Sequence, residues 1–114
     1  MKTTSKQKKD AVLDWELCLQ LAGNKPDLAK DILTILVKHL PAELAEIKQA
    51  RDNLPLLLRC VHKLHGAVSY CGVPRLKKTL ATFEASLKHE EISQIDLYLT
   101  KLEYEVTELI AEAS

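Results

Sequence analysis

Two histidines, His62 and His65, lie close together in the middle of the chain, in the segment His62-Lys63-Leu64-His65-Gly66-Ala67. An imidazole has an ordinary pKa of about 6.5, so one ring nitrogen is unprotonated and nucleophilic near neutral pH. An accessible histidine can therefore accept a phosphoryl group without an activating base, provided that nearby donors neutralise the phosphate oxygens. The same pair of imidazoles could instead bind a metal ion or serve only in packing.

The segment around these histidines has the pattern of an amphipathic helix. At about 100° per residue, His62 falls on a ridge with Arg59, Gly66 and Ser69, beside the apolar face, and His65 lies nearer the apolar border. We therefore expect solvent to reach His62. Glycine costs such a helix about 1 kcal/mol relative to alanine, so we expect another backbone, or a bulky group attached to the imidazole, to approach Gly66. The apolar face comprises Leu54, Leu57, Val61, Leu64 and Val68.

The run from His62 to Ala67 resembles the signature of histidine-containing phosphotransfer (HPt) domains. In that signature the acceptor histidine is followed by an apolar residue two positions on and usually by a lysine or arginine three positions on. A glycine and a small residue then follow. The continuation Ser69-Tyr70-Cys71-Gly72-Val73-Pro74-Arg75 is similar to the HPt module that ends hybrid sensor kinases of the BarA/GacS type. The resemblance covers about residues 10 to 112, and residues 61 to 76 carry its specific part. His65 departs from the signature, because it stands where most of the family has a fixed positive charge.

The resemblance implies a phosphorelay intermediate that is phosphorylated on His62. The phosphoryl group would come from the aspartate of a receiver domain in a hybrid sensor kinase and pass to the aspartate of a response regulator. No cofactor of its own is expected; Mg²⁺ is expected on the partner receiver domain, and the chain is expected to be monomeric. For His65, a role beside the phosphate and a partly buried structural role both remain open. The expected supporting residues are His65, Gly66, Lys63, Ser69, Arg59, Lys77 and Lys78.

The main alternative is a non-catalytic helical adaptor that docks a receiver-like or acidic protein partner without being modified. A metal site is disfavoured because Cys71 lies too far along the helix to complete one with the two histidines, and no Glu-x-x-His pair occurs. No Gly-x-x-x-x-Gly-Lys loop occurs either, so ATP-dependent kinase activity is not expected of this chain. Zero net charge and 4% aromatic residues argue against nucleic-acid binding.

Composition describes an ordinary soluble domain with an uneven charge distribution. A chain of 114 residues, 46% apolar and 28% charged, fits one globular domain. Sixteen basic and sixteen acidic residues cancel, yet no Asp or Glu occurs from Asn53 to Phe83. The positive field of this acid-free window favours an anionic ligand or partner. Its basic residues are Arg59, Lys63, Arg75, Lys77 and Lys78.

The remaining features concern the compartment. Three cysteines, Cys18, Cys60 and Cys71, show no CxxC spacing, which predicts reduced thiols. No apolar run approaches the roughly 20 residues needed to span a bilayer, and the N-terminus lacks the apolar segment of a secretory signal. We therefore expect a cytoplasmic protein, or the cytoplasmic end of a membrane-bound sensor kinase. Residues 1–9 are expected to be a disordered leader or linker, and residues 10–114 the HPt domain.

Hydrophobic periodicity predicts five helices, of which four are long. They cover about residues 10–22, 26–50, 53–71 and 74–88, and the stretch from Ser93 onward. The short connections predict an all-α fold, an antiparallel up-and-down four-helix bundle with a short extra N-terminal helix.

Local signals add details to this bundle. Pro41 predicts a kink or a break in the second helix, and Asn53 is the expected N-cap of the third. Gly72 suits a left-handed position after a helix end, and Ser93 resembles the start of a capping box with Asp96. Trp15 lies on the apolar stripe of the first helix, and we expect it to be a core residue.

Overall fold

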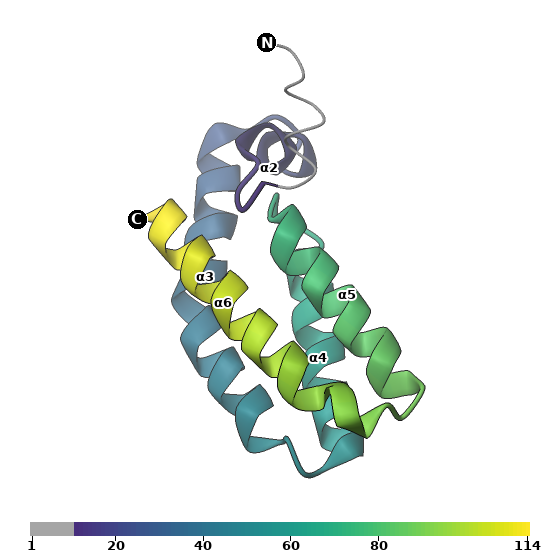
Figure 1. Cartoon of the computed structure of the whole chain (residues 1–114). Helices are drawn as coiled ribbons and strands as arrows, with labels where there is room; N and C mark the ends of the chain where they lie inside the picture. The colour runs from purple at the N-terminus through teal and green to yellow at the C-terminus, as the bar shows by residue number, and fades with distance from the viewer. Residues whose placement is uncertain (1–10) are drawn as a thin grey trace.

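The protein is an all-α bundle in the computed structural model, which describes residues 11–114. Figure 1 shows the long helices α3, α4, α5 and α6 side by side and the short helix α2 at one end. The predicted leader and the expected helix start at Asp10 lie outside the described residues. The elements are α2 (Trp15–Leu21), α3 (Pro26–Gln49), α4 (Leu54–Val68), α5 (Pro74–Lys88), the 3₁₀ helix η1 (Ile92–Gln94) and α6 (Ile95–Ala113).

The four long helices form a closed ring of neighbours. Helix α4 packs against α5, α5 against α6, and α3 against both α4 and α6. The expected up-and-down four-helix bundle with a short N-terminal helix is thereby confirmed, and within residues 11–114 no strand occurs. One core fills the space between the helices; its fully buried side chains include Leu40, Ile47, Leu57, Val61, Val68, Leu80, Phe83, Leu102 and Leu109.

The helix starts follow the expected local chemistry. Pro26 and Pro74 lie in the first turns of α3 and α5, where the missing N–H is not needed. Oδ1 of Asn53 accepts a hydrogen bond from the backbone N–H of Leu56 at 3.2 Å, so Asn53 is the N-cap of α4 as predicted. Because α4 and α5 are joined by only a few residues, they are antiparallel neighbours, and side chains of α5 face α4.

Pro41 does not break the second helix. Helix α3 runs without interruption from Pro26 to Gln49, so the expected break is wrong. Leu40 and Ile47 are fully buried on either side of the proline's position along α3. Their packing against the bundle outweighs the loss of one backbone hydrogen bond.

Gly72 is not in the left-handed conformation, so that prediction is also wrong. A Cβ at this position would lie 2.3 Å from the backbone oxygen of Asp14 and 2.7 Å from the backbone nitrogen of Cys18. The N–H of Asp14 also donates a 2.8 Å hydrogen bond to the carbonyl oxygen of Gly72. Glycine is therefore needed here because the start of α2 rests directly on the turn between α4 and α5.

Two further local expectations fail. Ser93 does not cap α6, whose N-cap is Gln94 without a side-chain hydrogen bond. The carboxylate of Asp96 instead binds the guanidinium of Arg51, with Nε–Oδ1 at 2.8 Å and Nη2–Oδ2 at 2.9 Å. Trp15 is 41% exposed, because α2 is short and buries Cys18 rather than the indole.

Candidate functional site

His62 stands on the outer face of α4, as predicted. The imidazole is 71% exposed, while the flanking Val61 and Leu64 are buried in the core. This arrangement follows from the amphipathic pattern of α4, which turns its apolar stripe inward and leaves the ridge of His62 outside. An external group can therefore reach the ring.

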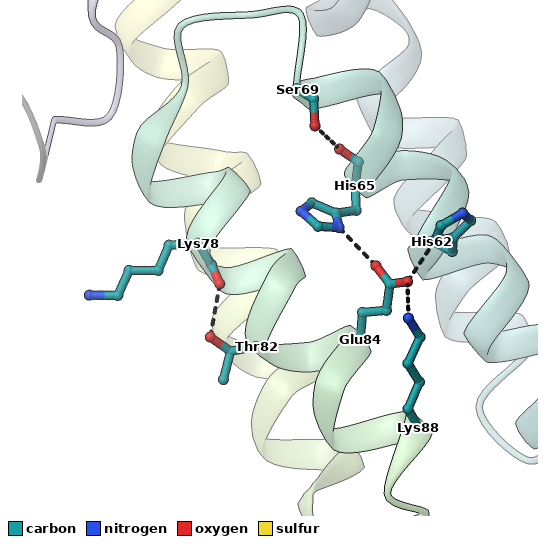
Figure 2. Close-up of polar contacts among 7 residues, drawn as sticks. All are labelled: His62, His65, Ser69, Lys78, Thr82, Glu84 and Lys88. Atoms are coloured by element: carbon teal, nitrogen blue, oxygen red, sulfur yellow. Dashed lines mark hydrogen bonds and ion pairs between the residues drawn. The ribbon is translucent and has the colours of Figure 1, made fainter.

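A buried carboxylate from the neighbouring helix, Glu84 of α5, holds both motif histidines (Figure 2). Nδ1 of His62 lies 2.6 Å from Oε2 of Glu84, and Nδ1 of His65 lies 2.8 Å from Oε1. The Glu84 side chain is only 7% exposed. Nζ of Lys88, one turn further along α5, lies 3.2 Å from the same Oε2. Each carboxylate oxygen thus has an imidazole of its own.

The contacts of Glu84 fix its charge. Burial by itself raises the pKa of the Glu84 carboxyl. The hydrogen bonds from His62, His65 and Lys88 together lower it by more than burial raises it, so the pKa is about 2. Glu84 is therefore an ionised carboxylate at neutral pH and can only accept hydrogen bonds. Both imidazoles must then donate from Nδ1–H. In neutral His62 this leaves Nε2 with its lone pair on the side of the ring away from Glu84 (Figure 2).

His65 is oriented differently from His62. The imidazole is 27% exposed, and Figure 2 shows its second ring nitrogen on the side away from His62. The backbone of the same residue is also engaged, because Oγ of Ser69 donates a 3.0 Å hydrogen bond to the carbonyl oxygen of His65. The Ser69 hydroxyl is thus occupied within its own helix.

Gly66 is exposed on α4, one turn beyond His62. No atom lies within 4 Å of the position that a Cβ on Gly66 would take. The expectation that another backbone approaches this glycine is therefore not met by any described residue of this chain. What the structure has instead is an open surface beside the imidazole.

The predicted basic residues are only partly gathered at the site. Arg59 and Lys63 are exposed on α4 with His62, and Nζ of Lys63 lies 3.7 Å from Oε2 of Glu43. Lys77 and Lys78 are exposed near the start of α5.

Figure 2 shows the Lys78 side chain extending away from His62. Arg75 is bound to α6, with Nη2 at 3.1 Å from Oε2 of Glu105. Lys78 and Arg75 therefore do not contact the His62 ridge.

Neither Glu84 nor Lys88 is predicted by the motif. The acid-free window ends at Phe83, so Glu84 is the first acid after it, and Lys88 follows one turn later. The sequence signal that could have pointed to Glu84 was the antiparallel pairing of α4 and α5. Side chains of α5 lean toward its N-terminus, so a residue placed after the window along the chain reaches back to the histidines in space.

Metal binding and thiol reactivity have little support in the described part of the chain. Among residues 11–114, no group of three or more His, Cys, Asp or Glu side chains is arranged to hold a metal ion. All three cysteines are free thiols, as predicted, and burial raises the pKa of the Cys71 thiol to about 11. No helix within these residues is long and apolar enough to cross a membrane.

Comparisons with known proteins identify a family and relatives for this chain. Residues 31–113 match the family model described as Hpt domain. The chain is 40% identical over 104 residues to the sensor histidine kinase GacS of Pseudomonas protegens, covering 90% of this chain and 11% of the relative. It is 38% identical over 81 residues to the signal transduction histidine-protein kinase BarA of Escherichia coli K12, covering 69% of this chain and 9% of the relative. The chain thus spans about a tenth of the length of these relatives.

A solved structure agrees in fold. The HPT domain from the Hpt sensor hybrid histidine kinase of Shewanella superposes with a TM-score of 0.81 at 31% identity, and the match covers 90% of each chain.

Proposed function

The chain belongs to the Hpt domain family, and we propose that it carries a phosphoryl group on Nε2 of His62 between receiver-domain aspartates of a multistep phosphorelay. The observation that carries this proposal is the exposed imidazole of His62, whose Nδ1 is bound to the buried carboxylate of Glu84 at 2.6 Å. A histidine held in this way presents one defined nucleophilic nitrogen to a partner. The sensor kinases GacS and BarA, which this chain resembles over part of their length, support the same assignment.

The transfer step follows from this geometry. The lone pair of Nε2 attacks phosphorus, the N–P bond forms, and the P–O bond to the donor aspartate breaks with its electron pair left on the carboxylate oxygen. No proton has to move, because Nδ1–H stays hydrogen-bonded to Glu84. The phosphorylated ring gains positive charge, which the ionised Glu84 balances. In the second transfer a carboxylate oxygen of the next aspartate attacks phosphorus, and the N–P bond breaks with its electron pair returned to Nε2. The ring then leaves as neutral imidazole, which makes this step favourable.

The remaining electrostatics are assigned to the partner. We propose no cofactor and no ATP-dependent kinase activity for this chain, and we assign Mg²⁺ to the receiver domain that docks on it. Lys63 and Arg59 are the exposed basic residues on the helix of His62, and they favour approach of an anionic active site. The proposed partners are the receiver domains of a hybrid sensor kinase and of a response regulator. We further propose that the domain acts in the cytoplasm as a monomer.

Phosphoryl transfer from a labelled receiver tests this proposal. A receiver domain is phosphorylated with radiolabelled acetyl phosphate, freed of the small molecule, and mixed with the chain and Mg²⁺. We expect acid-labile, alkali-stable label on the parent chain and none on His62→Gln. Label that still reaches His62→Gln would refute the assignment of His62. Binding of the receiver without any label on the parent would favour the non-catalytic adaptor instead.

A further inference from the structure

His65 and His62 share one carboxylate but do not face the same way. The Nδ1 atoms of His65 and His62 are 2.8 Å and 2.6 Å from the two oxygens of Glu84. Only Oε2 receives a further donor, Lys88 at 3.2 Å. Among the described residues, His65 is the one hydrogen-bond partner of Oε1 of Glu84. Removing that imidazole therefore leaves a buried carboxylate oxygen without its partner.

The second nitrogen of His65 does not serve the site. It lies on the side of the ring away from His62 (Figure 2), and the ring is largely covered. A phosphoryl group on Nε2 of His62 would lie on the side of the His62 ring that faces away from Glu84. His65 therefore has a direct path to Glu84 and no direct path to the phosphate.

We propose that His65 is a positioning residue that fixes the Glu84 carboxylate, and through it the Nδ1–H tautomer and ring orientation of His62. This inference rests on the proposed function for its effect on transfer, but the coupling itself is a property of the unphosphorylated chain. It explains how the chain accommodates an imidazole where the HPt signature usually has lysine or arginine. A hydrogen-bond donor to Glu84 is required at this position, and a permanent charge is not.

Two amide substitutions separate the nitrogens of His65. The amide nitrogen of asparagine lies at about the position of imidazole Nδ1, and that of glutamine at about the position of Nε2. His65→Asn therefore keeps a donor to Glu84, and His65→Gln keeps only a distal donor. We expect transfer by His65→Asn within about twofold of the parent, and transfer by His65→Gln and His65→Ala slower by about tenfold, a size typical of a misplaced reacting group.

The opposite order, with His65→Gln active and His65→Asn slow, would show that the distal nitrogen contacts the phosphate and would overturn the proposal. Equal rates for all variants would overturn it as well, because His65 would then serve only in packing. Urea unfolding of each variant identifies any that fails to fold. If His65→Ala or His65→Gln fails to fold, it is replaced by His65→Ser, which also lacks a donor at the Nδ1 position.

A second measurement does not depend on phosphorylation. Nitrogen-15 chemical shifts of the His62 ring, recorded at about pH 8.5, where an ordinary imidazole is neutral, report which nitrogen carries the proton. We expect mainly Nδ1–H in the parent and in His65→Asn, and a larger Nε2–H population in His65→Ala and His65→Gln. An unchanged tautomer in His65→Ala would sink the proposal. If the tautomer shifts but His62 is never phosphorylated, the proposed function fails and the coupling of His65 to His62 stands.

Discussion

Oε2 of Glu84 lies 2.6 Å from Nδ1 of His62, although the two residues are 22 positions apart and on different helices. The carboxylate is buried and ionised, and its hydrogen-bond donors are side chains of α4 and α5. A buried charge that loses its partner is costly, so the pair constrains both helices. The orientation of the proposed phosphate acceptor is therefore set by the packing of α5 against α4.

We predict that Glu84→Gln lowers phosphoryl transfer by about tenfold to a hundredfold, an effect in the range typical of losing a group that positions a reacting side chain. The amide keeps one acceptor oxygen, so one imidazole loses its acceptor, and the charge that balances the phosphorylated ring is lost. Single-turnover transfer from a labelled receiver measures the change. Glu46→Gln is the matched control, because Glu46 is exposed on α3, and its rate should equal that of the parent. A parent-like rate for Glu84→Gln would remove Glu84 from the mechanism.

Glu84 should also make the stability of the fold depend on acid pH. The folded-state pKa of Glu84, about 2, lies below the ordinary value of 4.5. A depressed carboxyl pKa contributes stability above the ordinary value, and this contribution is lost as the pH falls from about 4.5 toward 2. At about 1.4 kcal/mol per pKa unit, the contribution is at most about 3–4 kcal/mol.

Urea unfolding of the parent and of Glu84→Gln between about pH 2 and 7 measures this contribution. We expect the parent to be the more stable at pH 7 and its advantage to shrink as the pH falls below about 4.5. An advantage that does not change with pH would mean that Glu84 stabilises the fold by shape rather than by charge.

The features that the sequence predicted are those that depend on neighbours along the chain. Exposure of His62 follows from the apolar periodicity of its own helix, and capping by Asn53 from a contact within one turn. The bundle follows from helix length and short connections. Each of these needs no knowledge of how one helix is rotated against another.

The features that the sequence did not predict depend on contacts between helices. Glu84 reaches His62 because of the rotation of α5 against α4, which no local pattern fixes. Trp15 is exposed because α2 docks through Cys18. A glycine is needed at position 72 because the backbone of α2, distant in the sequence, packs against it, and not because a turn conformation requires it. In each case a distant element overrides the local preference.

We predict that Gly72→Ala destabilises the fold by about 1–3 kcal/mol, the usual cost of forcing extra atoms into a packed site. The new Cβ would lie 2.3 Å and 2.7 Å from backbone atoms of Asp14 and Cys18, which cannot rotate away as a side chain can. Helix α2 must then move off the turn between α4 and α5. Urea unfolding gives the change in free energy, and labelling of the buried Cys18 thiol should become faster. An unchanged stability would show that α2 does not rest on Gly72 in solution.

Gly66→Ala should have the opposite effect on stability and an adverse effect on transfer. Nothing lies within 4 Å of the new Cβ, and alanine is the better helix former by about 1 kcal/mol, so the free energy of unfolding should rise by about 0.5–1 kcal/mol. The methyl group, however, occupies the open surface beside His62 where the receiver domain must approach. We expect slower transfer, and a stronger loss for the larger Gly66→Leu.

The matched control for Gly66→Leu is Ala111→Leu, which adds a similar side chain to the exposed surface of α6, a helix that packs against α3 and α5. Transfer rates over a range of receiver concentrations separate weaker docking from slower chemistry, since weaker docking is overcome at saturation. We expect Ala111→Leu to match the parent and Gly66→Leu to need more receiver for the same rate. A more stable Gly66→Ala with unimpaired transfer, together with parent-like Gly66→Leu, would mean that the partner approaches His62 from another direction.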